Sequence, residues 1–203
     1  MAATNGGKLA QRAGKTKVSA SVRERLLSAA HSLFYDEGIH TVGIDRVIDE
    51  AGVAKASLYS TFGSKEELVT AYLSERDRAR KLRIEKAIAA HSAPVDQILA
   101  IYEMLGDLFV QQGFRGCAFI RASAEEKPGT PVRKVCDDSR AWVRSVFEQL
   151  ASRSGARHPE LLAQQLVLLY DGAAVGSQMD QGLEAARAAR AAAATLLESA
   201  IPS

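Results

Sequence analysis

The residues best suited to chemistry lie between Lys55 and Lys65, where small polar side chains surround two apolar ones. Leu58 and Phe62 are four residues apart, so on a helix they share the inward face and leave the other side chains outward. A small methyl group suits the methyl of thymine, and a hydroxyl donates to or accepts from base edges. The pattern therefore predicts a surface that reads the major groove of DNA through Ala56, Ser57 and Thr61.

Two short helices must position this surface. The first has one apolar stripe, formed by Val42, Ile44, Val47, Ile48 and Ala51. Gly52 ends it, because glycine adopts the left-handed conformation without steric cost. Val53 fills the corner, and the second helix is predicted from about Ala54 to Phe62. Helices joined by such a turn lie roughly 90–120° apart, which is the arrangement of a helix-turn-helix.

A longer set of residues extends this motif on both sides. It comprises Phe34, Gly38, Thr41, Val42, Ile44, Ala51, Gly52, Val53, Lys55, Leu58, Tyr59, Phe62, Ser64, Lys65 and Leu68. In this combination the chain resembles the N-terminal domain of TetR-type transcriptional regulators. The resemblance implies a homodimeric repressor that binds a palindromic double-stranded DNA operator and is released by a small-molecule effector, whose identity the sequence does not give.

The resemblance also implies phosphate contacts for Lys55, Tyr59 and Lys65, and the chemistry agrees because each side chain donates hydrogen bonds. Lys65 lies in a first helical turn, whose free amides attract anions. Thr41 can cap the first helix of the motif or contact a phosphate. Two other interpretations stay open: Tyr59 as half-buried packing, and the two lysines as solvated surface charge.

The whole chain has helical periodicity without convincing strand alternation, so we predict an all-α fold. A helix opens at the capping box of Ser21 and Glu24 and ends at Gly38. We assign residues 1–18 to a flexible basic arm, 19–63 to the helix-turn-helix DNA-binding domain, and 64–203 to a helical effector-binding and dimerisation domain. Residues 64–90 form the connecting helix of that domain, and its charged stretch from Glu75 to Lys86 is interpreted as a solvated face, with passage close to DNA as the alternative.

Glycine and proline divide the remaining sequence into further helices. We expect them at about 95–112, from near Cys117, at 131–154, from Pro159 onward, and at 183–200.

The composition is that of a soluble globular protein of 203 residues with a formal net charge of +2. Every charged residue before Glu24 is basic, so the arm can bind phosphates or serve as a solubilising tail. Two cysteines without a secretory leader, and no apolar run near 20 residues, predict a cytoplasmic protein that is not in a membrane. No residues have metal-ligand spacing, and we predict no metal or organic cofactor.

Large apolar side chains gather in the second half of the chain, where a ligand pocket would form between helices. The candidates are Tyr102, Phe109, Phe114, Cys117, Phe119, Trp142 and Tyr170, although an ordinary core explains most of them equally well. Cys117 is singled out because a helix start and the nearby Arg115 and Arg121 would lower a thiol pKa. It is either a reactive, ligand-contacting cysteine or a buried inert one.

Small residues mark one more surface. Gly172 and Gly176 are four apart and permit close helix approach. We predict a dimer interface at Leu169, Gly172, Ala173 and Gly176, formed by two helices from each subunit, with packing inside one chain as the alternative.

Two rival functions remain open. One is a helical-bundle thiol enzyme using Cys117 with His91 or His158, but no nucleophile-base motif surrounds these residues, so we predict that the protein is not an enzyme. The other is an adaptor that uses the helix-turn-helix to bind protein instead of DNA.

Overall fold

The computed structural model describes residues 20–180 and 182–202, and the predicted basic arm at 1–18 lies outside them. Within the described residues the regular structure is entirely helical, which confirms the all-α prediction. The helices are α1 (Val22–Asp36), α2 (Ile44–Ala51), α3 (Lys55–Phe62), α4 (Lys65–Ala89), α5 (Pro94–Phe109), α6 (Ala118–Glu125), α7 (Pro131–Arg153), α8 (Pro159–Asp180) and α9 (Glu184–Ala200). No helix in these ranges is long and apolar enough to cross a membrane.

The helices begin where local chemistry can satisfy their free amides. Ser21 Oγ accepts the Glu24 N–H at 3.2 Å, and the Glu24 carboxylate accepts the Ser21 N–H at 2.7 Å, which confirms the predicted capping box. At the start of α4, Ser64 Oγ accepts the Glu67 N–H at 3.1 Å. The Ser64 cap fixes where α4, the connecting helix, starts after the end of α3.

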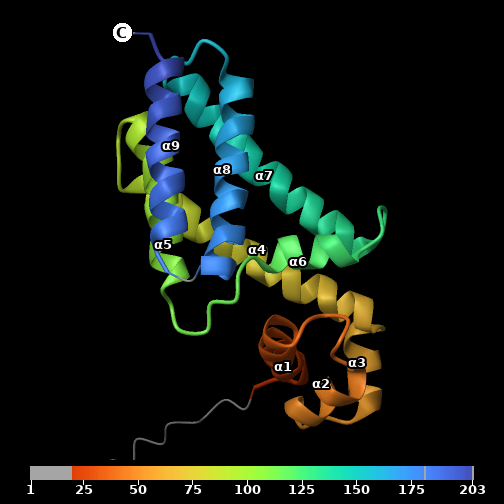
Figure 1. The fold of residues 1–203 in the computed structure, drawn as a ribbon. Coiled ribbons are helices and arrows are strands. Elements are labelled where there is room, and N and C mark those ends of the chain that lie inside the picture. The colour runs from red at the N-terminus through yellow and green to blue at the C-terminus, as the bar shows by residue number, and fades with distance from the viewer. Residues whose placement is uncertain (1–19, 181, 203) are drawn as a thin grey trace, which may run out of the picture.

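The buried side chains form two clusters (Figure 1). The N-terminal cluster unites α1, α2 and α3 with Leu68 to Leu73 of α4, and it extends to buried residues of α6 and the start of α7. The second cluster begins at Ile84 of α4 and continues through α5, α7, α8 and α9. Because α4 belongs to both cores, it joins the helix-turn-helix unit to the bundle as one continuous rod.

The α5 helix ends at Phe109, three residues before the predicted end at Gln112. The chain turns back there: Gly113 has a φ of +82°, and the Phe114 ring packs on Phe109 with their centroids 5.0 Å apart. Burying Phe114 against α5 requires this turn, and a helix that continued to Gln112 would carry Phe114 away from that contact.

Candidate nucleic-acid interface and ligand cavity

The turn between α2 and α3 is held by the backbone and by an arginine. Gly52 has φ 60° and ψ 43°, and the Val53 N–H donates to Ile48 O at 3.1 Å. Arg25 of α1 donates to the carbonyls of Ala51 at 3.4 Å and Gly52 at 3.0 Å. Sequence reasoning missed Arg25, because its role depends on the way α1 packs across the turn.

Helix α3 packs inward through Leu58, which is fully buried, and through the half-buried Phe62. Ala56 and Thr61 are exposed, Ser57 is half-buried, and Tyr59 remains 46 % exposed. The Thr61 hydroxyl donates to Ser57 O at 2.6 Å, which leaves its lone pairs to accept from a base. The predicted reading residues therefore lie together on the outer face of one helix.

Lys55 is exposed and forms an ion pair with Asp45 of α2, at 2.9 Å from Nζ to Oδ1. The hydrogen bond and the charge of Asp45 raise the pKa of Lys55. A phosphate at this position would compete with Asp45 for the ammonium group.

Lys65 and Thr41 lie beside α3 in different surroundings. Lys65 is half-buried, its ammonium is 6.0 Å from the centre of the Phe34 ring, and burial lowers its pKa. Thr41 is exposed, but the N-cap of α2 is Gly43, which has no side chain to offer. The capping interpretation of Thr41 was wrong because α2 starts two residues later than that interpretation requires.

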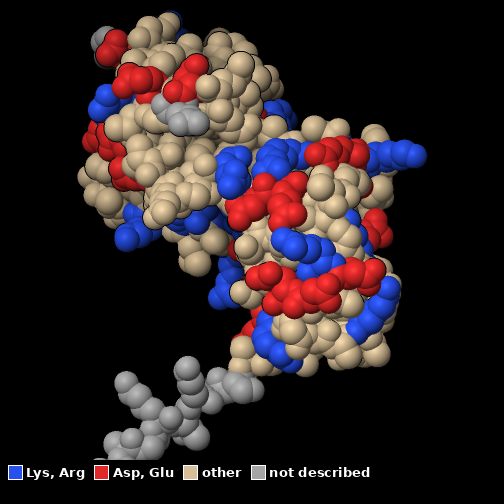
Figure 2. Space-filling view, turned by 60° about the horizontal axis from the view of Figure 1, so that its bottom comes forward, with Lys and Arg blue, Asp and Glu red and all other residues tan. Residues whose placement is uncertain are grey.

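The charges around α3 do not form a uniformly basic surface. From Ser21 to Leu73 the sequence has five Lys or Arg residues and eight Asp or Glu residues. Acidic and basic side chains are accordingly intermixed over this part of the molecule (Figure 2). Residues 21–73 therefore carry a formal net charge of −3, five basic minus eight acidic side chains.

A cavity of about 280 Å³ lies where α1, α4, α5, α6 and α8 meet. Five residues predicted for a ligand pocket line it, namely Phe109, Phe114, Cys117, Phe119 and Tyr170. A neighbouring cavity of about 260 Å³ shares Cys117, Phe119 and Tyr170 with it and extends toward α7. Because the first cavity opens between the N-terminal unit and the bundle, we call it the junction cavity.

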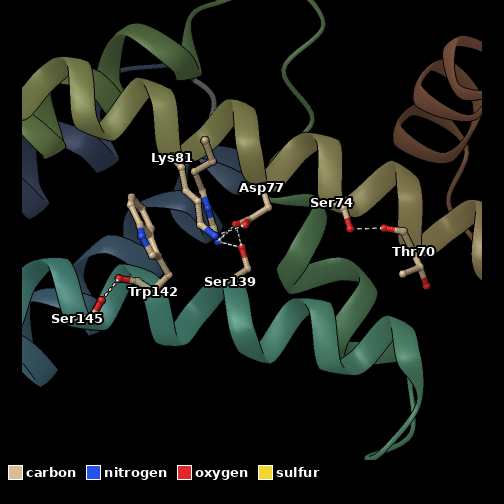
Figure 3. A network of polar contacts seen from close by, with 8 residues as sticks. Thr70, Ser74, Asp77, Lys81, Ser139, Trp142 and Ser145 are labelled. Carbon is tan, nitrogen blue, oxygen red and sulfur yellow. Dashed lines mark hydrogen bonds and ion pairs between the residues drawn. The ribbon is translucent and has the colours of Figure 1, made fainter. Parts of the chain in front are cut away.

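Two predicted pocket residues line neither cavity. Tyr102 is fully buried in the bundle core and donates its hydroxyl to Leu166 O at 2.7 Å. Trp142 lies on α7 beside Lys81 of α4, whose ammonium is 5.4 Å from the centre of the indole (Figure 3). An aromatic-rich sequence does not distinguish a core-filling ring from a cavity-lining one, so both predictions were wrong.

Three arginines of α4 line the junction cavity and were not predicted as site residues. Arg76, Arg80 and Arg83 follow each other at i, i+4 and i+7, so they lie on one face of the helix. All three are half-buried. The interpretation of this charged stretch as a solvated face was therefore wrong for these residues, because α5, α6 and α8 cover them.

Arg80 is fixed by polar partners from two helices. It pairs with Asp77 at 3.2 Å and hydrogen-bonds with Ser139 of α7, and Asp77 and Ser139 also contact each other. Asp77 and Ser139 face each other across α4 and α7 (Figure 3). The Arg80 guanidinium also stacks 4.3 Å from the centre of the Phe119 ring. Its position between the two cavities is thus set by α6 and α7.

Cys117 is half-buried at the N-cap of α6 and lines both cavities. The two arginines expected to act on it are engaged elsewhere: Arg115 pairs with Asp36 at 2.8 Å, and Arg121 donates to Tyr35 O at 2.9 Å. That part of the argument for a reactive thiol was wrong. Cys136, which lines the second cavity, is buried, and burial raises its pKa to about 11.

Tyr35 links the DNA-binding unit directly to the junction cavity. It belongs to α1 and also lines the cavity. Its hydroxyl donates to Gly116 O at 3.0 Å and accepts the Arg115 N–H at 2.9 Å. The Arg76 guanidinium lies 3.8 Å from the centre of its ring. The 115–116 segment and Arg76 are therefore both in direct contact with a side chain of α1.

The predicted dimer residues do not share one surface. Ala173 is buried in the bundle, and a Cβ on Gly176 would lie 3.1 Å from Ala185 Cβ of α9 in the same chain. Leu169 is half-buried against the core, and Gly172 alone is exposed with open space around it. The small residues at 173 and 176 serve packing within the chain, so they were wrongly assigned to a dimer interface.

A different face of α8 is apolar and exposed. Leu161, Leu168, Val175 and Met179 all retain at least 41 % exposure, and their spacing of seven, seven and four residues places them in one stripe with Gly172. The spacing of these side chains is visible in the sequence, but their exposure was needed to distinguish this stripe from the buried face of α8.

Among the described residues, no group of three or more His, Cys, Asp or Glu side chains is arranged to hold a metal ion. The exposed polar face of α3 on a glycine-hinged helix pair, joined by α4 to a helical bundle with a cavity, defines a helix-turn-helix transcriptional regulator. Residues 26–72 match the family described as bacterial regulatory proteins, tetR family.

A solved TetR-family regulator from Streptomyces coelicolor, SCO4454, is 32 % identical with a TM-score of 0.85, over 89 % of this chain and 96 % of that one. The regulator LmrA of Bacillus subtilis is 29 % identical over 66 % of this chain and 72 % of its own length. The transcriptional repressor NemR of Escherichia coli is 27 % identical over 80 % and 86 %. The chain belongs to the TetR family of transcriptional regulators, which are not enzymes, so the thiol-enzyme alternative is set aside.

Proposed function

We propose that the protein is a homodimeric repressor that binds a palindromic operator through α3 and is released when a small molecule occupies the junction cavity. Tyr35 carries this proposal, because one side chain belongs to the DNA-binding unit and to the cavity wall. A ligand that favours one position of the 115–116 segment would shift α1, and release follows if the two states bind that ligand with different affinity. Such a regulator would act in the cytoplasm.

In this proposal α3 lies in the major groove. Ala56, Ser57 and Thr61 face the base edges, and Thr41, Lys55, Tyr59 and Lys65 contact phosphates on either side. The basic arm adds four positive charges next to a unit with more acidic than basic residues, so it should supply much of the non-specific attraction.

The variants Lys55→Ala and Tyr59→Ala test the phosphate contacts. We expect weaker binding to all DNA sequences, and for Lys55→Ala a salt slope reduced by about 1. Lys86→Ala is the control, since Lys86 is an exposed lysine at the far end of α4. Unchanged affinity and slope in both α3 variants would favour the protein-binding adaptor.

The homodimer is proposed to form through the exposed stripe of α8. Leu168 is 66 % exposed and Met179 is 79 % exposed. Packing the stripe of one subunit on the same stripe of a second subunit would remove both from water. Two reading helices would then meet half-sites roughly 34–36 Å apart or a little more.

Sedimentation of Leu168→Glu tests this interface. We expect a monomer that has lost operator affinity, because one half-site alone binds weakly. Leu82→Glu is the matched control, since Leu82 is a leucine on α4 with 58 % exposure that lies outside the stripe. A Leu168→Glu protein that stays dimeric would rule out α8 as the interface.

Repression is proposed because a bound dimer occludes the DNA it covers. The similarity to NemR, which is named a repressor, supports this choice. Transcription from a promoter that contains the operator should rise when the gene for this protein is deleted.

A further inference from the structure

The junction cavity has an unbalanced charge. Among its described lining residues are Arg76, Arg80 and Arg83, and no aspartate or glutamate. Arg80 has Asp77 as a partner, whereas Arg76 and Arg83 form no ion pair with any described residue. Nε of Arg83 is buried and has no hydrogen-bond partner in the structure. Partly buried cations without an anion are costly, and a bound anion would remove that cost.

The neighbouring cavity provides an internal comparison. It also has three arginines, but each one has a carboxylate partner: Arg80 with Asp77, Arg133 with Asp137, and Arg140 with Asp171. In the neighbouring cavity a carboxylate therefore balances the charge of each arginine. In the junction cavity, Arg76 and Arg83 have no carboxylate partner among the described residues.

Most of the side chains on the α5 side of the junction cavity are apolar, whereas the polar Gln111 and Gln112 line it just beyond the end of α5. Met104, Leu105, Leu108 and Phe109 of α5 form one wall, and Phe114 and Ala174 continue it. Tyr170 lies on the arginine side, and burial raises its pKa to about 12, so its hydroxyl stays protonated and can donate. The volume of about 280 Å³ is just below the range typical of ligand sites, roughly 300–1,000 Å³. The site therefore suits a small molecule with one charged end.

We propose that the junction cavity binds an organic acid, with its carboxylate held by Arg76, Arg80 and Arg83 and its apolar body against α5. A guanidinium fork matches the two carboxylate oxygens, which makes arginine well suited to this task. Burial and the positive charges of Arg76 and Arg80 already lower the pKa of Arg83, and an incoming anion would offset both effects. As an identification of the effector, the inference rests on the proposed function.

The coupling to DNA follows from the same residues. Arg76 stacks on Tyr35 of α1, and all three arginines belong to α4, which continues directly from the DNA-binding unit. An acid that draws these side chains together would act on both α1 and α4. Occupancy of this site can thus change the placement of α3 without contact to it.

Titration calorimetry on the free protein tests the site without DNA. The probes are octanoate with octan-1-ol, and 4-phenylbutyrate with 4-phenylbutanamide. We expect each acid to bind about ten- to a hundredfold more tightly than its neutral partner, since hydrogen bonds to charged groups are the stronger ones. Equal affinity within a pair, or no binding of either acid, would overturn the proposal.

Arg83→Gln should lower acid affinity by about tenfold or more and leave octan-1-ol binding unchanged. Arg83→Lys should retain part of the affinity because it keeps the charge. Arg78→Gln is the matched control, an exposed arginine of the same helix outside the cavity. Without ligand, Arg83→Gln should unfold at the same temperature as the wild type or higher, so lost binding cannot be attributed to misfolding. Wild-type acid affinity in Arg83→Gln would contradict the assignment.

A separate measurement of DNA release distinguishes the two proposals. If the acids bind but do not release the protein from its operator, the carboxylate site is supported and its role as the effector site is excluded. If the protein binds an operator but none of the four probes, the proposed regulatory function stands and the carboxylate site is overturned.

Discussion

Replacing Tyr35 by phenylalanine should uncouple the junction cavity from the DNA-binding unit. The variant keeps the ring, and with it the Arg76 contact at 3.8 Å, but it loses the hydrogen bonds to Gly116 O at 3.0 Å and from the Arg115 N–H at 2.9 Å. Each such bond contributes about 0.5–1.5 kcal/mol net, and the bond from the Arg115 N–H is exposed to solvent. We therefore expect a loss of about 1–2 kcal/mol of coupling, roughly 5–30-fold.

Fluorescence anisotropy of a labelled operator provides the assay. The ratio of operator affinities with and without the tightest-binding acid probe should fall by that factor in Tyr35→Phe. Tyr102→Phe is the control, because it loses a hydrogen bond of 2.7 Å to Leu166 O inside the bundle and should reduce stability without changing the ratio. A Tyr35→Phe ratio within about twofold of the wild type would refute Tyr35 as the link, since even one net hydrogen bond exceeds that change.

Further variants test single contacts. Gly116→Ala should lower the free energy of unfolding by about 2–4 kcal/mol, because φ is +89° and the new Cβ would clash with the Gln178 side chain. Adding Gln178→Ala should relieve only the clash, and full recovery of stability in denaturant titration would show that the positive φ carries no cost. Asp45→Asn should tighten operator binding about fivefold at low salt by freeing Lys55, and weaker binding would indicate that Asp45 itself contacts DNA. A maleimide should label the half-buried Cys117 faster than the buried Cys136, and octanoate should slow the labelling of Cys117; equal rates for the two thiols by peptide mass spectrometry would contradict the greater accessibility of Cys117.

Local signals were enough to predict most of the fold. The capping box at Ser21, the left-handed Gly52 and the cap at Ser64 act within a few residues, so the sequence contains the whole interaction. The outward face of α3 follows equally from the inward pair Leu58 and Phe62. The end of α5 was missed because it depends on how Phe114 packs back on Phe109 and the bundle core, which helical periodicity does not show.

The ligand cavity was only partly predictable, since its polar half is created by tertiary packing. Arg76, Arg80 and Arg83 have the spacing of any charged helix face, and only the cover of α5, α6 and α8 makes them a site. The same limit applies to Gly176, whose small size serves α9 in the same chain instead of a second subunit. The spacing of residues shows which side chains share a helix face, but only the tertiary structure shows which helix packs on that face.

Selection of bound sequences from a random double-stranded DNA pool at near-physiological salt tests the central claim most directly. The purified protein should enrich a palindrome with two equal half-sites, as expected for two α3 helices related by a dimer axis. The Leu168→Glu variant should fail to enrich it under the same conditions. No enriched motif from folded, dimeric wild-type protein, with or without octanoate, would contradict direct operator reading by α3.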